Sequence, residues 1–359
     1  MNSVTRNRAY PAIQALIAAL LFGASAPFAK LLLGEIEPIP LAALLYFGSG
    51  IGLLGLKVIW RRDYQAVETE ARITKPDIVW LAGAILAGGV AAPITLLFSL
   101  QETPAATASL LLNFEGVATT LIALLAFKEA ISRRAWWAIA LITLSSIFLS
   151  INPHAGWGFS FGALGIILAC ILWGIDNNFT RNICAKDPLM IVTIKGLVAG
   201  TFSFGMAIAL GNRLPAPSVV FGAMLLGCLS YGVSITLFIH AMRGLGAART
   251  SALFGTAPLA GMLLSLVLFR ELPNWLFVAA FALMIIGTLV LVREPHEHDH
   301  THEPTIHDHA HTHDDGHHEH EHKAEYSVRH SHLHRHDESI HAHHHMPDIH
   351  HRHAHASES

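Results

Sequence analysis

Ionisable residues inside long apolar stretches are the first candidates for chemistry in this chain. Glu115 lies eleven residues after Pro104, which places it about 16 Å along a helix and near the middle of a bilayer. Asp176 lies near the end of another apolar stretch, directly before Asn177. A charged side chain at the bilayer centre costs about 2.5 kcal/mol or more, so such residues are rare without a use. Carboxylates in this setting can bind a solute or a coupling proton.

These residues predict a central cavity lined by polar side chains. The predicted solute-binding or proton-binding residues are Ser25, Asn113, Glu115, Asp176 and Asn177. Structural roles are the alternative, because Asp176 can pair with Arg181 and amides can hold two helices together. We expect Lys195 to extend along its helix toward the membrane interface, and we expect the lone His240 to be interfacial.

A second group of residues that could carry chemistry lies in the C-terminal tail, which holds 24 of the 26 histidines. They form six groups of four, many of them His-x-His. Neutral imidazole suits Zn, Ni, Co and Cu(II), whereas the lack of cysteine in the tail argues against a thiolate site. The residues predicted to bind metal are His296, His298, His300, His302, His307, His309, His311, His313, His317, His318, His320 and His322.

The tail also has a simpler interpretation. Its net charge is −9 with histidine neutral, against +6 for residues 1–295, and it becomes positive as histidine protonates near pH 6.5. It has no apolar periodicity, so we predict a disordered segment when it is free.

The rest of the chain must position these residues, and it consists of ten apolar segments. Each has 17 to 25 residues, enough to cross a hydrocarbon core of about 30 Å. Asp187 before Pro188 and Thr103 before Pro104 predict helix starts with a capping side chain. The segments are 10–33, 39–60, 77–101, 104–127, 135–151, 159–180, 188–210, 217–241, 247–269 and 274–292.

An internal repeat divides these segments into two halves. An offset of 142 residues aligns Ser109–Glu129 with Ser251–Glu271, and both stretches end on a basic-acidic pair. The first copy carries Asn113 and Glu115 where the second has glycine and alanine. A different offset, of 151 residues, aligns Phe22-Gly23 in the first segment with Trp173-Gly174 in the sixth. The repeat predicts an all-α membrane protein built from two five-helix halves.

The positive charges predict the orientation. With the N-terminus inside, fifteen Lys and Arg residues fall on the cytoplasmic side and three on the outer side. We therefore expect a multi-pass protein of the plasma (inner) membrane with both termini cytoplasmic. Ala24-Ser25-Ala26 resembles a signal-peptide cleavage site, but the apolar run continues to Leu33, so we expect an uncleaved first helix. Five helices per half give the two halves opposite orientations, which suits alternating access.

The paired motifs resemble a known family. Gly23 to Lys30, Lys128-Glu129, Gly174 to Arg181 and Arg270-Glu271, on ten helices with short loops, are similar to the EamA-domain members of the drug/metabolite transporter superfamily. The resemblance covers about residues 10–292 and implies a fold of two inverted repeats and a transport function. It implies one repeat in 1–151, a second in 157–292, and leaves the His-rich tail of 293–359 outside.

These observations favour a secondary transporter that exports a small organic metabolite, amino-acid-like or drug-like, with a metal-binding tail. A transition-metal exporter fed by the tail and a membrane-tethered metal sensor or buffer are the alternatives. An enzyme is not expected, because the apolar segments contain no Ser/His/Asp set, metal pair or phosphate loop. The expected partners are the lipid bilayer, the solute and divalent transition metals, with no nucleic acid and no required cofactor. A second copy of the chain, as a homodimer, is a further candidate partner.

Overall fold

The computed structural model describes most of the chain. The described residues are 9–60, 73–127, 133–152, 158–183, 186–245, 250, 253–270 and 273–292, and in the tail 299–302, 305–311, 330–336 and 339–342. Lys128, Glu129 and Glu271 of the two predicted basic-acidic pairs lie outside the described residues, whereas Arg270 follows the ninth segment.

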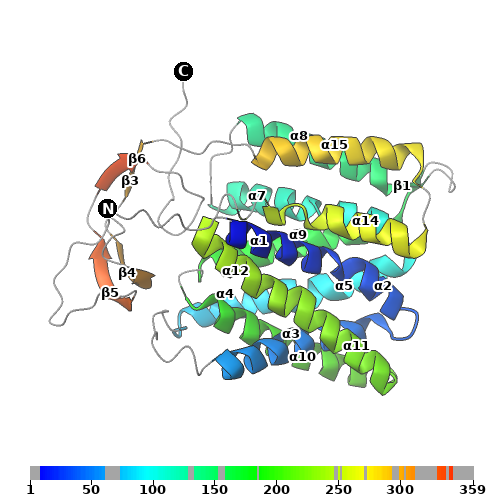
Figure 1. Ribbon diagram of the computed structural model, residues 1–359, viewed down its shortest axis with the longest axis horizontal. Coiled ribbons are helices and arrows are strands. Elements are labelled where there is room, and N and C mark those ends of the chain that lie inside the picture. Colours follow the sequence, from blue (N-terminus) through cyan, green and yellow to red (C-terminus); the bar gives the residue numbers. More distant parts are fainter. Residues whose placement is uncertain are drawn as a thin grey trace.

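The first half of the chain folds into helices that follow the first five predicted segments (Figure 1). Three of the five are divided into shorter elements. In chain order the helices are α1 (Ala9–Gly23) and α2 (Ser25–Leu32); α3 (Pro38–Trp60); α4 (Asp77–Ala84), the π-helix η1 (Ile85–Ala91) and α5 (Ala92–Glu102); α6 (Ala105–Leu111) and α7 (Phe114–Phe127); and α8 (Arg133–Ser150).

The second half repeats this order. Its helices are α9 (Phe161–Arg181), α10 (Pro188–Ala209), α11 (Pro217–Gly227) with the π-helix η3 (Cys228–Val233) and α12 (Ser234–Leu245), α14 (Ala257–Phe269), and α15 (Trp275–Val292). A two-stranded antiparallel pair, β1 (Ile151–Asn152) and β2 (Gly158–Phe159), links the halves. The ten-helix duplicated arrangement is therefore confirmed. The ninth segment differs from the prediction, because its described long helix begins at Ala257 rather than at 247.

Local sequence explains some of these helix starts. The carboxylate of Asp187 accepts hydrogen bonds from the backbone N–H groups of Leu189 and Met190, at 2.9 and 3.2 Å, as a capping side chain does. At the other predicted start, the Thr103 hydroxyl donates backward to the carbonyl of Ser99 in α5, at 2.8 Å, and α6 begins after Pro104.

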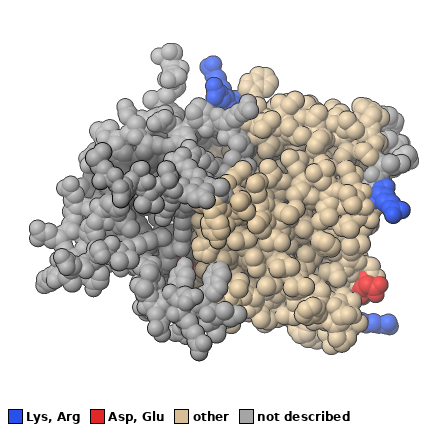
Figure 2. Space-filling view, viewed as in Figure 1, with Lys and Arg blue, Asp and Glu red and all other residues tan. Residues whose placement is uncertain are grey.

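The bundle is a membrane-spanning protein. Seven helical stretches among the described residues are long and apolar enough to cross a bilayer, and α14 and α15 are shorter apolar helices. Figure 2 shows a face of the bundle that is almost free of charged side chains, with the visible Lys, Arg, Asp and Glu residues at its edges. Such a face is compatible with hydrocarbon.

The two halves interlock through equivalent helices. The second and seventh segments, α3 and α10, pack together, as do the fifth and tenth, α8 and α15, and the fourth and ninth, α6 and α14. The first segment contacts the eighth through α1 and α12, and the third contacts the sixth through α5 and α9. Because an odd number of spans precedes the second half, this pairing joins two halves of opposite orientation.

The interruptions in the helices also fall at equivalent positions. The π-helices η1 and η3 begin 143 residues apart, in the third and eighth segments. The fourth segment breaks between α6 and α7 at Leu112 and Asn113, and the ninth has a turn at Gly255 and Thr256 before α14. Irregular backbone at membrane depth is tolerated where protein or a water-filled cavity surrounds it.

The described parts of the tail contain strands. β3 (Asp299–His302) pairs antiparallel with β6 (Ser339–Ala342), and β4 (Thr305–His311) pairs antiparallel with β5 (His330–His336). A two-stranded pair alone is marginally stable in water, so disorder of the free tail stays a prediction.

Glycines permit the closest helix crossings. A Cβ on Gly48 of α3 would lie 2.1 Å from the carbonyl oxygen of Met224 in α11, and one on Gly227 would lie 2.0 Å from that of Leu45. The two backbones therefore touch at this crossing, which only glycine allows, and small residues at such contacts are how membrane helices associate.

We expect Gly48→Ala to destabilise the bundle by about 1–3 kcal/mol, because its methyl group must displace backbone rather than a side chain. The matched control is Gly205→Ala in α10, where a Cβ meets nothing within 4 Å. Thermal unfolding of the detergent-solubilised chain measures both. Equal melting temperatures for the two variants would contradict this account of the crossing.

Candidate functional site

The site is centred on the break in the fourth segment, where α7 begins with Glu115 in its first turn. One carboxylate oxygen of Glu115, Oε1, accepts a hydrogen bond from the amide nitrogen of Asn177 in α9, at 2.9 Å. The same amide nitrogen lies 3.1 Å from the hydroxyl oxygen of Thr119, one turn along α7. Glu115 and Asn177, both predicted site residues, therefore meet directly across the boundary between the two halves.

Asn178 fixes the two helices against each other at this point. Its amide nitrogen donates to the carbonyl oxygen of Thr119 at 3.0 Å and to that of Gly174 at 2.8 Å. A Cβ on Gly174 would lie 2.9 Å from the backbone nitrogen of Thr119, so the two helices are in close backbone contact. The residues next to Asn177 thus have a structural role that holds Glu115 in place.

Asp176 forms an ion pair with Lys195 of α10. The Lys195 ammonium nitrogen lies 2.7 and 2.6 Å from the two carboxylate oxygens, and Thr180 donates to the same carboxylate at 3.0 Å. The Asp176 and Lys195 side chains are only 7% and 17% exposed, so the pair is shielded from solvent. Lys195 is therefore the described ion-pair partner of Asp176, and the expectation that Lys195 extends to the interface is wrong.

The π-helix η1 contributes a backbone carbonyl to the same region. The carbonyl oxygen of Gly88 accepts hydrogen bonds from the Tyr46 hydroxyl, at 2.6 Å, and from the Trp173 indole nitrogen, at 3.1 Å. A Cβ on Gly88 would lie 1.9 Å from a carboxylate oxygen of Asp176. A side chain is therefore excluded at this position, and the backbone of the third segment lies directly against the ion pair.

A row of aromatic rings leads away from this region. The ring of Tyr46 stacks on that of Tyr231 in η3 with centroids 6.0 Å apart, and Tyr231 meets Phe22 edge-on at 5.9 Å. Phe22 then contacts Phe254 at 5.3 Å, and Phe254 contacts Phe238 at 4.8 Å. The row joins elements of both halves.

The five predicted residues have different surroundings. Ser25, buried at the start of α2, is a hydrogen-bond partner of the Tyr231 side chain. Glu115 lies within electrostatic range of Asp176 and Lys195. Asn113 instead donates to the carbonyl of Leu110 in its own segment, at 3.3 Å. Ser25, Glu115, Asp176 and Asn177 therefore share one region, whereas the described hydrogen bond of Asn113 is local.

Sequence reasoning missed the aromatic residues and the lysine of this region. Tyr46, Trp173 and Tyr231 are single aromatic residues in apolar segments, where packing is the ordinary explanation. The sequence repeat did not single them out. The structure places Tyr231 at the position of Gly88, because the two π-helices begin 143 residues apart. The Tyr231 side chain of the second half therefore occupies the position at which the first half has only the backbone of Gly88.

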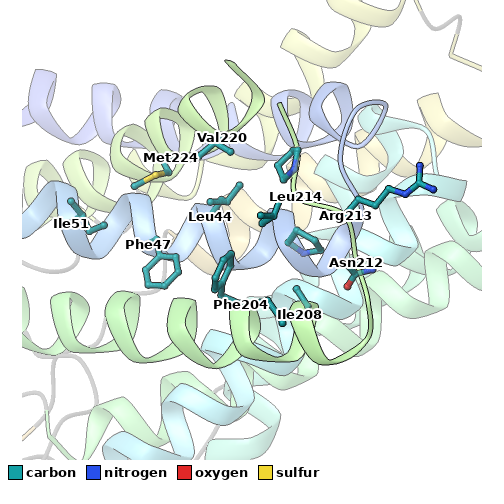
Figure 3. A pocket seen from close by; sticks show the side chains of 13 residues that line it. Leu44, Phe47, Ile51, Phe204, Ile208, Asn212, Arg213, Leu214, Val220 and Met224 are labelled. Atoms are coloured by element: carbon teal, nitrogen blue, oxygen red, sulfur yellow. The ribbon is translucent and has the colours of Figure 1, made fainter. Parts of the chain in front are cut away.

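The described cavity of about 370 Å³ lies elsewhere, between α3, α10 and the α11 segment (Figure 3). Its lining is almost wholly apolar, with Leu44, Phe47, Phe204 and Met224 among the side chains shown, and with Asn212 and Arg213 at one end. It shares no lining residue with the polar region around Glu115. An apolar cavity of this kind can be filled by lipid and supplies no group for chemistry.

The predicted metal ligands and the other candidate ligands are spread over several elements. Within the described part of the chain, no three His, Cys, Asp or Glu side chains come together as a metal site. His240 lies in α12. Of the predicted metal ligands, His300 and His302 lie in β3, and His307, His309 and His311 lie in β4. The predicted ligands His296, His298, His313, His317, His318, His320 and His322 lie outside the described residues.

The fold and the polar region together define a membrane transporter made of two interlocked five-helix repeats. The chain belongs to the EamA-like transporter family, whose pattern matches residues 10–151 and 160–293. A relative from Methanothermobacter thermautotrophicus, described as an uncharacterized transporter, is 27% identical over 296 residues, which cover 78% of this chain and 85% of the relative. A solved structure described only as the crystal structure of a protein has a TM-score of 0.57 and 21% identity, and covers 78% of this chain and 97% of that one. At that identity the solved structure supports the fold alone.

We expect Lys195→Gln to lower the melting temperature of the detergent-solubilised chain more than the double variant Asp176→Asn/Lys195→Gln does. The single change leaves a buried carboxylate without its cation, which costs about 3–5 kcal/mol, whereas the double change removes both charges. A double variant no more stable than the single variant would show that the ion pair is not what holds α9 and α10 together here.

Proposed function

We propose that this protein is a secondary transporter that exports a small organic solute across the plasma (inner) membrane by alternating access. The observation that supports it best is the hydrogen bond between Glu115 and Asn177. It joins a carboxylate of one half to an amide of the other, beside a broken helix, at membrane depth. Secondary transporters bind their solutes in such positions, at the interface of the repeats and next to discontinuous helices.

Glu115 is the proposed proton-binding and solute-binding group. Its only described hydrogen-bond donor is a neutral amide, whereas Asp176 already has the ammonium group of Lys195. A carboxylate whose described donor is a neutral amide has oxygen lone pairs left to accept a proton or to bind a cationic group of the solute. Protonation of Glu115 and solute binding would then compete for the same oxygen atoms.

Asp176 and Lys195 are proposed to position the site rather than to bind the solute. The pair lies against Gly88, and Gly88 is held by Tyr46 and Trp173, so the ion pair fixes the bulged backbone of the third segment. On the side of the other π-helix, η3, the site is bounded by Tyr231 and Ser25. The regions around η1 and η3 are similar, and an exchange of their conformations would open the site to one side of the membrane and then to the other.

The proposed orientation of the chain in the membrane rests on its charge distribution, and the proposed direction of transport rests on the family. The excess of Lys and Arg on one side supports cytoplasmic termini. The tail is then cytoplasmic, and we propose that its histidines bind Zn, Ni, Co or Cu(II).

A transition-metal exporter fed by the tail is the second candidate, favoured by the 24 histidines in the tail. A membrane-tethered metal sensor or buffer without transport is the third. The described bundle offers the metal exporter no gathered set of metal ligands along the path.

We expect Glu115→Gln to abolish proton-coupled transport while leaving membrane insertion unchanged, because glutamine keeps an oxygen for Asn177 but cannot exchange a proton. The measurement is solute-dependent proton movement in proteoliposomes, with a panel of amino acids and small organic amines. Glu102→Gln is the matched control, since Glu102 is exposed at the end of α5. Full activity of the Glu115 variant would remove Glu115 from the mechanism.

We expect truncation after Pro295 to remove metal binding and to leave organic-solute transport unchanged, because the proposed site lies wholly within the bundle. Flux of the same solute panel and of Zn²⁺ or Ni²⁺ is compared in liposomes with and without the tail. Metal flux that depends on the tail, without any organic-solute flux, would favour the metal exporter instead.

A further inference from the structure

The apolar cavity of Figure 3 opens on the lipid-facing surface of the bundle. It lies between α3 of the first half and α10 and α11 of the second, so both halves line it. The side chains at its edge, Ile51, Ile208 and Leu214, are largely exposed. Within the membrane this edge faces hydrocarbon, and an apolar space of this kind does not hold water.

The cavity has the length of one lipid leaflet. Along α3 its lining runs from Pro40 to Ile51, which are eleven residues or about 16 Å apart. Half of a hydrocarbon core is about 15 Å. Pro40 lies near the start of α3 and Arg213 just after the end of α10, so both mark the same membrane surface. The cavity therefore reaches from that surface to about the middle of the bilayer, as one acyl chain does.

The interior of the cavity suits an acyl chain. Two of its lining rings, Phe47 of α3 and Phe204 of α10, meet edge-on with centroids 6.1 Å apart. Its volume of about 370 Å³ lies in the range of small-molecule sites, about 300–1,000 Å³. All lining side chains except Asn212 and Arg213 are apolar, so only one end can orient a ligand. A helix of a second copy, about 10 Å wide with its side chains, is too broad for this space.

The end of α10 builds the polar end of the cavity. Gly211 has a φ of 74°, a conformation that ends a helix. The backbone N–H of Asn212 then donates to the carbonyl of Ala207 at 3.0 Å, which closes the last turn. This turn carries the chain across the end of the cavity and places Asn212 and Arg213 there (Figure 3).

Two opposite charges lie at this polar end. The side-chain amide of Asn212 donates to one carboxylate oxygen of Glu37, which directly precedes α3. The other oxygen of Glu37 can accept a further hydrogen bond. Arg213 is exposed, and its guanidinium has no ion-pair partner within the described part of the chain. The end of the cavity thus offers a cation to a phosphate group and a carboxylate to an amine.

We propose that this cavity is a binding site for a phospholipid with a primary-amine headgroup, of the phosphatidylethanolamine type. One acyl chain fills the apolar length, the phosphate binds Arg213, and the ammonium group binds Glu37. A choline headgroup has no N–H to donate, and a glycerol headgroup leaves a net negative charge beside Glu37. The proposal does not depend on the proposed solute or on its binding at Glu115.

A lipid in this cavity stabilises the contact between the two halves. An empty space deprives the side chains around it of dispersion contacts, and an acyl chain restores them on α3, α10 and α11 together. A ligand that binds only the folded chain raises the melting temperature according to its affinity and concentration. Lipid binding can therefore be measured as thermal stabilisation.

The experiment is thermal unfolding of the full-length chain in a nonionic detergent, titrated with lipids of identical acyl chains. The lipids are phosphatidylethanolamine, phosphatidylcholine and phosphatidylglycerol. The mole fraction of lipid at half of the full rise in melting temperature reports its affinity. We expect this midpoint to be about threefold lower for the ethanolamine lipid than for the other two.

Variants at the polar end separate the two headgroup contacts. Arg213→Gln should raise the midpoint for the ethanolamine lipid by about threefold or more, whereas Arg213→Lys keeps the charge and most of the affinity. Glu37→Gln should remove the preference for ethanolamine over choline lipid, because the new amide still accepts from Asn212 but carries no charge. Arg270→Gln is the matched control, since Arg270 is also exposed and on the same predicted side but does not line the cavity.

Four results would overturn the proposal. Equal midpoints for the three lipids would mean that hydrocarbon alone is bound, and a lowest midpoint for phosphatidylglycerol would exclude an amine at Glu37. An effect of Arg270→Gln as large as that of Arg213→Gln would reduce both to general surface charge. Ala207→Phe places a ring in the cavity, so an unchanged lipid response of this variant would locate the lipid elsewhere. Ile208→Trp, at the exposed edge, provides the same test if the buried Ala207 variant does not fold.

Discussion

A hydrocarbon surrounding offers no hydrogen bonds, so every polar group of the bundle must find its partner within the protein. The rest of the polar region depends on this constraint. The carboxylate of Asp176 has an ammonium group and a hydroxyl, and the carbonyl of Gly88, left exposed by a π-helix, has two side-chain donors. These satisfied groups form a fixed scaffold. Glu115, by contrast, has a neutral amide as its described donor.

Close backbone contact allows this scaffold to form between two halves of one chain. Gly48 and Gly227 bring α3 and α11 together, and Gly174 brings α9 against α7. The consequence is that the site belongs to neither half alone. Glu115 comes from the first repeat and Asn177 from the second, so a relative movement of the halves changes the geometry around the carboxylate directly.

The sequence was sufficient for the ten segments and the repeat, because segment length, apolarity and repeat offset can be read directly along the chain. It was insufficient for partners across helices. Lys195 was placed correctly in its segment, but its distance from the interface said nothing of a carboxylate on the neighbouring helix. Gly88 gave no signal either, since its importance lies in a carbonyl released by irregular backbone.

The π-helices also determine which way the residues that follow them face around the helix axis. A π-turn inserts about one residue into an α-helix, and one residue corresponds to about 100° of rotation. The residues after η1, such as Leu97 and Leu100 in the core, therefore face inward only because that residue is present. The same holds for α12 after η3, at the equivalent place in the other half. The insertion is present in both copies, so loss of one residue in one copy would turn the outer part of one span and leave its counterpart unchanged.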